Sequence, residues 1–458
     1  MQHKFATRFL FCVALIGAVY ASASWGAEDS ALSDEAKPLQ VDEVPERVRP
    51  ILEIGDTFLG AGNIKSGFTL PTGAVWQPNF ILWGTYRTAI NSFDDGIVPG
   101  SERVTEWVNR LDLFGQLSLS QTERVVIGFR PIDKNGEFSG YRFNPNSDSV
   151  DSSNDDVNLL YFEGNLAEIF PHSGRTKRRR LDIDFSIGRQ PLQFQEATLI
   201  NDIMDSIAFT RNNITLLPKA TNTRVAVIYG WDKVNRGNNV EDPDAKLFGL
   251  FTETDFPRST VNLDFVYVDS DITGDGFYAG LSAVQRFGKV NTAFRILHSE
   301  PTSGSTSETT RGTLAVAEIS WTPAHTYNNV YTNFFWAIDA FNSASRDAAT
   351  GGPLGLTGIL YAATGLGAYP APLGNNAIES VGGALGYQMF FANNRRQLIL
   401  ELGARTDTDG TQRNQAAIGV RYQQAIGNRY VLRFDGFLSE QENFGAGWGG
   451  RVEFQIKL

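Results

Sequence analysis

From about residue 79 to the C-terminus, the sequence repeats one unit, a run of alternating apolar and polar residues followed by a connector. The last run shows the pattern, with Trp448, Gly450, Val452, Phe454, Ile456 and Leu458 alternating with Arg451, Glu453, Gln455 and Lys457. Successive side chains of a strand point to opposite faces. Each run therefore predicts a β-strand with one apolar face and one polar face.

The connectors between these runs alternate in length. Short turns are predicted at Ser120 to Arg124, Asp255 to Thr260, Phe287 to Lys289, Ala392 to Arg396 and Ala425 to Arg429. Long polar loops are predicted at Ile132 to Asp156, Asp232 to Ala245, Glu300 to Arg311, Asn342 to Ala377 and Thr406 to Asn414. This alternation predicts an all-β fold over residues 79–458, a transmembrane up-and-down antiparallel β-barrel of about 18 strands (16 to 18) with both termini in the periplasm.

The first residues resemble a secretory signal. The charged residues His3, Lys4 and Arg8 precede an apolar run, and the small residues Ala21, Ser22 and Ala23 follow it. This pattern predicts a signal peptide over residues 1–23, with cleavage after Ala23 or as late as Ala27. The apolar run of about 12 residues is too short for a membrane-spanning helix, which needs about 20. We therefore expect strands to cross the membrane, and the cell outer membrane as the location.

The segment between the signal and the first strand, residues 24–78, is acidic at first and then rich in Gly and Pro. It is either a periplasmic linker or a small plug of the barrel, and the sequence leaves both open.

The average composition resembles that of a soluble protein, with a net charge of -11 and a mean hydropathy of -0.21. A barrel gives the same average because lipid-facing and lumen-facing residues alternate. A soluble two-sheet sandwich also alternates, but connectors that alternate in length disfavour it. Aromatic residues near the ends of runs are typical of interfacial girdles, although any sheet is enriched in them; they include Trp83, Trp107, Trp231, Trp321, Tyr327, Trp336, Tyr387, Tyr430 and Trp448.

The residues that carry most enzyme chemistry are scarce. Cys12 is the only cysteine and lies in the predicted signal, and the histidines after it are His172, His298 and His325. The sequence has no Gly-x-Ser-x-Gly motif and no His/Cys metal spacing. We expect no catalytic activity, no metal and no cofactor. The basic run Arg175 to Arg180 falls in a predicted periplasmic turn, so we expect no nucleic-acid binding.

Two long loops contain apolar residues. In residues 191–205 and just beyond, Leu199, Ile203 and Ile207 are spaced by four, which suggests a short helix. It would either pack against the barrel interior and narrow the channel or cap the mouth. The loop Asn342 to Ala377 is either a lid or a mobile surface segment; its apolar residues favour burial.

Charged residues on the polar face predict a wet lumen, because unpaired charges are costly in a dry core. We expect these residues to line the pore and set its selectivity: Arg110, Asp112, Glu196, Asp202, Asp205, Arg295, Glu401, Arg421, Arg433, Asp435, Arg451 and Glu453. The arginines gather on the last four strands, and Glu196, Asp202 and Asp205 belong to the loop that is a candidate for folding inward. The two sets either create a transverse field or form pairs that stiffen the wall.

Several of these residues carry a resemblance to a known family. The strand end Ile187-Gly188-Arg189-Gln190 before an inward loop, the turn Thr122-Glu123-Arg124, the arginine-bearing late strands and about 18 strands resemble outer-membrane porins, with the alginate-export barrel as the nearest type. The resemblance implies passage of hydrophilic solutes or of oligosaccharide and polysaccharide. Two features differ from that type: the charged residues are nearly balanced in sign, and Leu458 stands where Phe usually ends the chain.

The expected function is that of a channel (porin) for passive or substrate-selective diffusion of small hydrophilic solutes or oligo- and polysaccharide. The alternative is a surface barrel that transports nothing and whose outer loops bind a partner or polysaccharide. The expected partners are outer-membrane lipid and lipopolysaccharide, a hydrophilic solute, and the barrel-assembly machinery through the C-terminal strand. No subunit interface can be identified from the sequence.

Overall fold

A computed structural model describes residues 48–55, 67–96, 103–173, 180–215, 217–303, 306, 308–410, 413–442 and 445–458. All of them belong to the compact unit Arg47–Leu458. The predicted signal peptide and the first half of the predicted periplasmic segment lie outside these residues.

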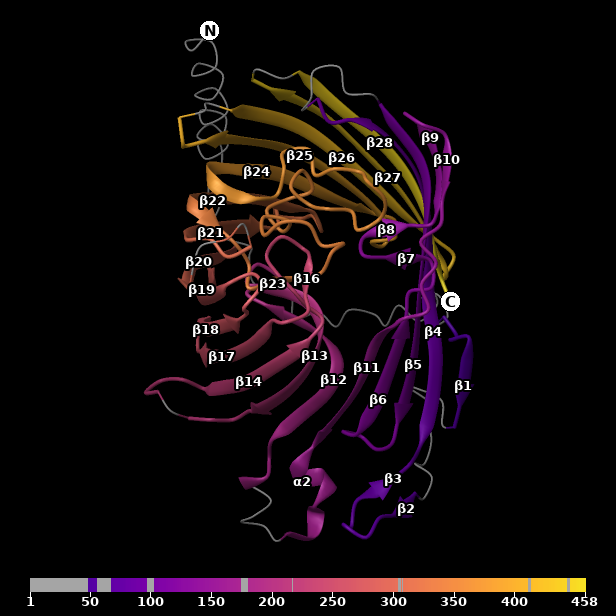
Figure 1. The fold of residues 1–458 in the computed structure, drawn as a ribbon, viewed down its shortest axis with the longest axis vertical. Coiled ribbons are helices and arrows are strands. Elements are labelled where there is room, and N and C mark those ends of the chain that lie inside the picture. The colour runs from indigo at the N-terminus through magenta and orange to yellow at the C-terminus, as the bar shows by residue number, and fades with distance from the viewer. Residues whose placement is uncertain are drawn as a thin grey trace. The chain divides into compact units, whose positions relative to one another are not determined.

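The wall of the molecule is a closed antiparallel barrel of eighteen strands, which confirms the predicted fold class. The last strand pairs with the first, from Trp448↔Asp94 to Lys457↔Thr85. Figure 1 shows the ring of strands. The wall strands are β4 (Asn79–Asp94), β5 (Val104–Ser118), β6 (Arg124–Phe129), β11 (Val157–Asn165), β12 (Asp184–Phe194), β13 (Ile200–Arg211), β14 (Asn222–Asp232), β17 (Lys246–Phe256), β18 (Ser259–Asp269), β19 (Asp275–Phe287), β20 (Val290–Ser303), β21 (Gly312–Trp321), β22 (Asn329–Phe341), β24 (Ala377–Phe391), β25 (Arg396–Asp407), β26 (Asn414–Ile426), β27 (Tyr430–Gln441) and β28 (Ala446–Lys457).

Tight turns alternate with longer loops around the barrel, as the sequence predicted. The chain reverses between Phe256 and Ser259 and again between Phe287 and Val290. The longest connector, from Phe341 to Ala377, joins β22 to β24. One end of the barrel therefore carries most of the tight turns, and the other carries most of the long loops. The exceptions include the long connector between β11 and β12, residues 166–183, and the short turn between β12 and β13, residues 195–199.

Short elements lie outside the main wall or extend it. They are β1 (Leu52–Ile54), β2 (Phe68–Thr69), β3 (Val75–Trp76), β7 (Asp133–Lys134), β8 (Glu137–Phe138), β9 (Gly140–Asn144), β10 (Asp148–Val150), β15 (Val234–Asn235), β16 (Glu241–Asp242), β23 (Ser345–Arg346), the helix α2 (Leu166–Ile169) and the 3-10 turn η1 (Pro171–Ser173). In the described part of the chain, no helix has the length and apolar character needed to cross a bilayer.

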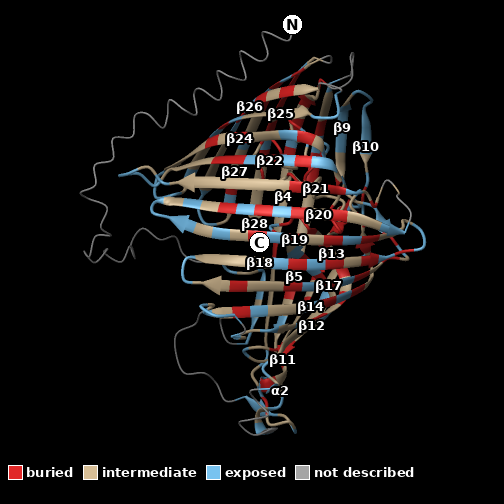
Figure 2. Ribbon diagram, turned by 90° about the vertical axis from the view of Figure 1, so that its left-hand side faces the viewer, coloured by how far each residue is buried: buried red, intermediate tan, exposed pale blue. Residues whose placement is uncertain are grey.

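Burial alternates along the strands of the wall, which Figure 2 shows as changes of colour along several of them. On β27, Phe434 and Leu438 are 40% and 63% exposed on the outer face, whereas Val431, Phe437 and Ser439 are buried on the inner face. An exposed apolar exterior is what a lipid-facing wall requires.

The inner face is less polar than the sequence suggested. A large buried apolar cluster lies inside the barrel and includes Leu199 and Met204 of the β12–β13 hairpin, Leu247 of β17, Val266 of β18 and Leu360 of the β22–β24 loop. Loops that fold inward supply the apolar partners of these wall residues. Part of the lumen that we expected to be wet is therefore packed.

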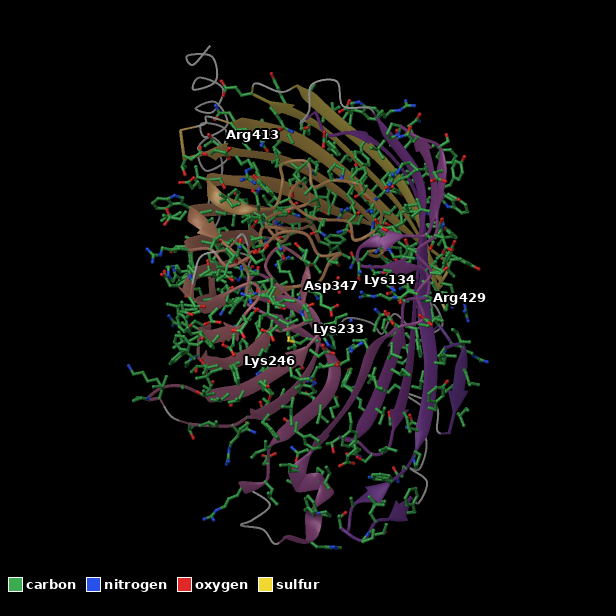
Figure 3. All side chains as sticks on the ribbon, in the orientation of Figure 1. Lys134, Lys233, Lys246, Asp347, Arg413 and Arg429 are labelled. Atoms are coloured by element: carbon green, nitrogen blue, oxygen red, sulfur yellow. The ribbon has the colours of Figure 1, made fainter. Side chains whose placement is uncertain are left out.

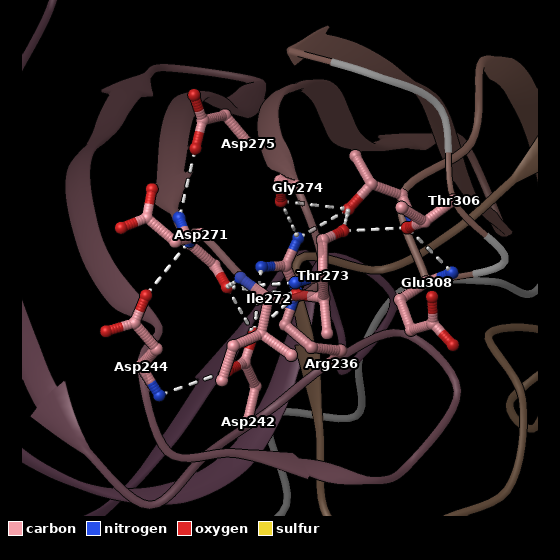
Figure 4. A network of polar contacts seen from close by, with 12 residues as sticks. Arg236, Asp242, Asp244, Asp271, Ile272, Thr273, Gly274, Asp275, Thr306 and Glu308 are labelled. Carbon is pink, nitrogen blue, oxygen red and sulfur yellow. Dashed lines mark hydrogen bonds and ion pairs between the residues drawn. The ribbon is translucent and has the colours of Figure 1, made fainter.

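At the end of the barrel that carries most of the long loops, one buried arginine connects three of these loops. Arg236, in the β14–β17 loop, donates to the carbonyl of Gly274 over 3.2 Å and to the hydroxyl of Thr309 over 2.6 Å. Its guanidinium lies 3.7 Å from Asp242, and both side chains are inaccessible to solvent. Asp242 also accepts hydrogen bonds from Ser270 and Thr273. Figure 4 shows these contacts, which join residues of the β14–β17, β18–β19 and β20–β21 loops.

Candidate channel constriction

The upper part of the β12–β13 hairpin leaves the wall. β11 and β12 pair only from Asn165↔Asp184 to Leu160↔Arg189, and beyond Arg189 β12 pairs with β13 alone. Gly188 lies at the branch with φ +120, where a Cβ would come within 2.2 Å of the Leu160 carbonyl oxygen. A residue without a side chain permits this close approach.

The branch is held by Arg189. Its guanidinium binds both carboxylate oxygens of Asp205, over 2.8 and 2.9 Å, and donates to the carbonyl of Val157 over 3.1 Å. A bidentate arginine–carboxylate pair is among the strongest side-chain contacts. The hairpin therefore leaves the wall at a defined point.

The tip of this hairpin packs on the inner face of the neighbouring wall, where only β14 separates β13 from β17. Phe194 stacks on Phe251 of β17 with ring centroids 3.5 Å apart, and Gln195 donates to Asp264 of β18 over 2.7 Å. Leu199 and Ile200 are fully buried. The expected contact with the barrel interior is therefore present.

The predicted helix in residues 191–205 is wrong. The segment consists of the end of β12, a turn over residues 195–199 and the start of β13. A spacing of four places residues on one face of a helix, but it also places them on one face of a strand, since four is a multiple of two. The pattern therefore could not separate the two structures.

The loop between β22 and β24 fills much of the remaining space. Its β23 pairs in parallel with β13, Ile200 with Ser345 and Asn201 with Arg346. Ser345 also donates to Asp202, and Arg346 donates to the carbonyl of Ala197 over 2.7 Å. The segment that we expected to be a lid or mobile surface is thus packed inside the barrel.

Farther along this loop, charged wall residues bind its backbone. Glu401 accepts the amides of Ile359 and Leu360, over 3.0 and 2.8 Å. Glu106 accepts the amide of Ala368 over 2.7 Å, and Arg110 donates to the carbonyl of Gly365 over 3.1 Å. These wall charges therefore position the loop. Glu106 was missed from the sequence because nothing local marks a wall carboxylate that caps a distant backbone.

A third insertion comes from the loop between β6 and β9. The hairpin β7–β8 places Phe138 among Ala89, Val108 and Leu366, where all four are buried. Figure 3 labels Lys134 of this hairpin and Asp347 of the β22–β24 loop, which both project into the ring of strands. Three inward segments therefore meet inside the barrel.

These segments leave a cavity of about 480 Å³. Its charged lining residues are Arg110, Arg130, Asp202, Arg346 and Asp347. Arg110 binds Asp112 over 3.0 Å, and Arg130 lies 3.2 Å from Asp112 and 3.5 Å from Asp347. Gln193, Asn201 and Ile203 of the displaced hairpin also line it.

Two charged groups in the inward loops are perturbed by burial. Burial raises the pKa of Asp133 to about 6, against the opposing effect of Arg110 and Arg130. Burial lowers the pKa of Arg346 to about 10, partly offset by Asp202. Among the described residues, no carboxylate oxygen lies within ion-pair distance of Arg346, which instead donates to carbonyls such as that of Gly351 over 2.6 Å.

The arginines on the late strands are paired within the wall. Asp435 accepts from Arg421 and, over 2.6 Å, from Arg451, and Glu453 lies 3.2 Å from Arg451 and 3.4 Å from Arg433. Arg87 of β4, which we did not select from the sequence, binds Glu453 over 2.8 Å. This geometry favours the alternative in which paired charges stiffen the wall.

Two of the three loop carboxylates have partners of their own. Asp202 is buried and bonded to Asn235 and Ser345, Asp205 binds Arg189, and Glu196 is exposed at the hairpin tip. The local partners of Asp202 and Asp205 thus also favour the alternative of paired charges over a transverse field. Arg295 binds Glu318 on the neighbouring strand. Contact of a solute with any of the twelve selected residues stays a prediction.

Within the described ranges, no group of three or more His, Cys, Asp or Glu side chains is arranged to hold a metal ion.

Comparison with known proteins gave matches by structure alone. No family model matches the chain, and no curated protein matches it. Among solved structures, OccK2 (OpdF) of Pseudomonas aeruginosa in complex with glucuronate has a TM-score of 0.55 at 9% identity and covers 83% of this chain and 98% of its own. The outer membrane protein OpdK of the same organism has a TM-score of 0.53 at 11% identity, covering 82% and 98%. OprD of the same organism has a TM-score of 0.53 at 7% identity, covering 83% and 95%.

The chain thus has the porin-type outer-membrane barrel fold. The structures it resembles are OprD and Occ proteins, so they do not support the alginate-export barrel as the nearest type. At these identities the likeness concerns the fold alone.

Proposed function

We propose that this protein is an outer-membrane channel for small hydrophilic solutes. One observation carries the proposal: a closed barrel with an apolar exterior holds, between its inward loops, a cavity of about 480 Å³ lined by arginine and aspartate side chains. A constriction made of fixed charges selects solutes by size and charge. Diffusion through such a path needs no catalytic group, and we expect no enzymatic activity.

The test is the conductance of the purified protein in planar lipid bilayers. Discrete current steps are expected from a channel. If no steps occur while the barrel is folded, the other candidate gains support, a surface barrel whose outer loops bind a partner or polysaccharide.

We further propose that small carboxylates are the preferred solutes. Arg346 is a buried cation at the cavity that donates to three backbone carbonyls and to the Ser343 hydroxyl. No carboxylate is among these described partners, so a solute carboxylate would supply the missing counter-charge. The structurally similar OccK2 was solved with glucuronate. Liposome swelling should be faster with glucuronate than with glucosamine of the same size. Equal rates would contradict the charge preference, and swelling by long uronate oligomers would instead favour the polysaccharide-export alternative.

The C-terminal strand is the proposed contact with the barrel-assembly machinery. β28 keeps an outward row of Trp448, Val452, Phe454 and Ile456 and is followed by Leu458. If Leu458 takes the place of the usual terminal Phe, Leu458→Phe should insert into outer membranes at least as efficiently as the natural chain. A clear loss of insertion would oppose this role.

A further inference from the structure

The seam where the barrel closes contains a third segment. β28 ends beside the middle of β4: Lys457 pairs with Thr85, and Leu458 exchanges two backbone hydrogen bonds with Gly84, of 2.9 and 3.3 Å. β4 begins at Asn79, so residues 79–83 extend beyond the end of β28. An unpaired edge there would expose backbone hydrogen-bonding groups.

The strand β1 covers this edge. Leu52 pairs with Leu82, Glu53 with Ile81 and Ile54 with Phe80, all antiparallel to β4. Figure 1 shows β1 beside β4, close to the C-terminus of the chain. The guanidinium of Arg429, in the β26–β27 turn, donates to the carbonyl of Arg49 over 3.3 Å and ties the approach to β1 to the same rim.

β1 continues the line of β28. Both run antiparallel to β4, and along β4 the partner positions pass from Gly84, opposite Leu458, to Leu82, opposite Leu52. Only Trp83 lies between them. Two segments from opposite ends of the sequence therefore act as one composite closing strand.

The side chains of β1 keep the alternation of the wall. Leu52 and Ile54 stand opposite Leu82 and Phe80, which share the face of β4 on which Ile90 is exposed. Leu52 is 44% exposed and Ile54 56% exposed. Glu53 faces the other way. The apolar outer belt therefore passes without interruption from β28 across β1.

We propose that β1 is part of the membrane-contacting wall, with Leu52 and Ile54 against lipid at the periplasmic boundary of the bilayer. These two side chains extend the apolar exterior of β4 and β28, and lipid is the partner that covers that exterior. The inference rests on the proposed outer-membrane location. It places the end of the predicted periplasmic segment in the wall.

Lipid-quenching fluorescence tests the proposal. Since Cys12 is the only cysteine of the chain, single-cysteine variants are made in a Cys12→Ser background: Leu52→Cys, Ile54→Cys, Glu53→Cys and, as a reference in the barrel wall, Leu400→Cys. Each carries a small fluorophore and is reconstituted into phosphatidylcholine vesicles with nitroxide labels near the lipid carbonyls. We expect quenching at positions 52 and 54 to exceed that at position 53 at least threefold and to approach that at position 400.

The outcomes distinguish failure of the proposed function from failure of the proposed position of β1. If position 400 is not quenched, the barrel is not in the bilayer and the proposed function fails. If position 400 is quenched while positions 52 and 54 behave like position 53, the present inference is overturned. Positions 52 and 54 shielded from both lipid nitroxides and aqueous iodide would mean that a protein partner or a second copy covers β1, which also overturns it.

A disulfide experiment checks the pairing independently. Glu53→Cys with Ile81→Cys joins register partners, whereas Glu53→Cys with Trp83→Cys is two positions out of register. A disulfide needs Cα atoms within about 7 Å, so the first pair should cross-link in vesicles at least fivefold more than the second. The gel-mobility shift of the folded barrel on heating identifies variants that fold. Equal cross-linking of the two pairs in folded protein would refute the composite strand.

Discussion

The backbone amide of Leu360, in the loop between β22 and β24, donates to the carboxylate of Glu401 on β25 over 2.8 Å. The amide of Ile359 binds the other carboxylate oxygen over 3.0 Å, and the hydroxyl of Tyr331 donates to the same group. The Glu401 side chain is 1% exposed. A buried carboxylate with three donors is well compensated, and here it fastens a loop to the barrel wall.

Glu401→Gln should loosen this loop. The amide keeps the size of the side chain but loses the charge, and its NH₂ group opposes the backbone donors. Hydrogen bonds to charged groups contribute about 1.5–3 kcal/mol each, so the population of displaced loops should rise by roughly tenfold. Single-channel recordings should show larger and noisier currents. Glu440→Gln, at an exposed position on β27, is the control, and traces of the two variants that cannot be distinguished would contradict the role of Glu401.

Acidification should shift ion selectivity through Asp133. Burial raises the pKa of its carboxyl to about 6, so the group is charged at pH 7.5 and becomes neutral as the pH falls through 6. The surroundings of Arg110 and Arg130 then gain one unit of positive charge, and the ratio of anion to cation permeability should rise between pH 7 and pH 5. Because the folded-state pKa is raised, ionisation of this carboxyl lowers the stability of the fold; the cost is fully present above pH 6 and declines as the pH falls from about 6 to the ordinary value of 3.8.

The reversal potential in a salt gradient measures this change. Asp133→Asn should show the acidic selectivity already at pH 7.5 and no step near pH 6. Asp151→Asn is the control in the same loop, because hydrogen bonds from Ser153 lower the pKa of Asp151. A step near pH 6 that survives in Asp133→Asn would assign the titration to another group.

The wall could be predicted from the sequence because its causes are local. Alternation along β27 and β28 follows directly from strand geometry, and the tight turns between Phe256 and Ser259 or Phe287 and Val290 fall where the apolar runs stop. Strand count and closure follow from these local patterns.

The interior could not be predicted in the same way, because its contacts join distant residues. Glu401 meets Leu360 and Glu106 meets Ala368 only after the long loop folds inward. The spacing of Leu199, Ile203 and Ile207 suits a helix and a strand equally. Whether this segment forms an inward hairpin therefore depends on the residues that contact its tip. The charged residues were found, but their partners were not.

Phe194→Ala should open the constriction from the side of the hairpin. The ring of Phe194 stacks on Phe251 with centroids 3.5 Å apart and holds the tip against β17. Truncating a packed Phe costs about 3–5 kcal/mol, and the partial exposure of Phe194 places the loss near 3 kcal/mol or below. We expect a higher single-channel conductance with an unchanged melting temperature of the barrel wall by circular dichroism. Phe391→Ala, on the exposed end of β24, should leave conductance unchanged. A similar increase in conductance in that variant would contradict a specific role of the hairpin tip.

The buried pair of Arg236 and Asp242 should make a larger contribution to loop rigidity than to barrel stability. Arg236→Met leaves Asp242 buried and without its cation, and breaking a buried ion pair on one side costs about 3–5 kcal/mol. Asp242→Asn alone leaves the arginine charge uncompensated. The double variant removes both charges, so its loss should be smaller than the sum of the two single losses by about 1–3 kcal/mol, the range of coupling between contacting residues. Limited proteolysis of the outer loops in detergent micelles measures the opening free energy of each variant. Additive losses would mean that the two side chains act independently despite their separation of 3.7 Å.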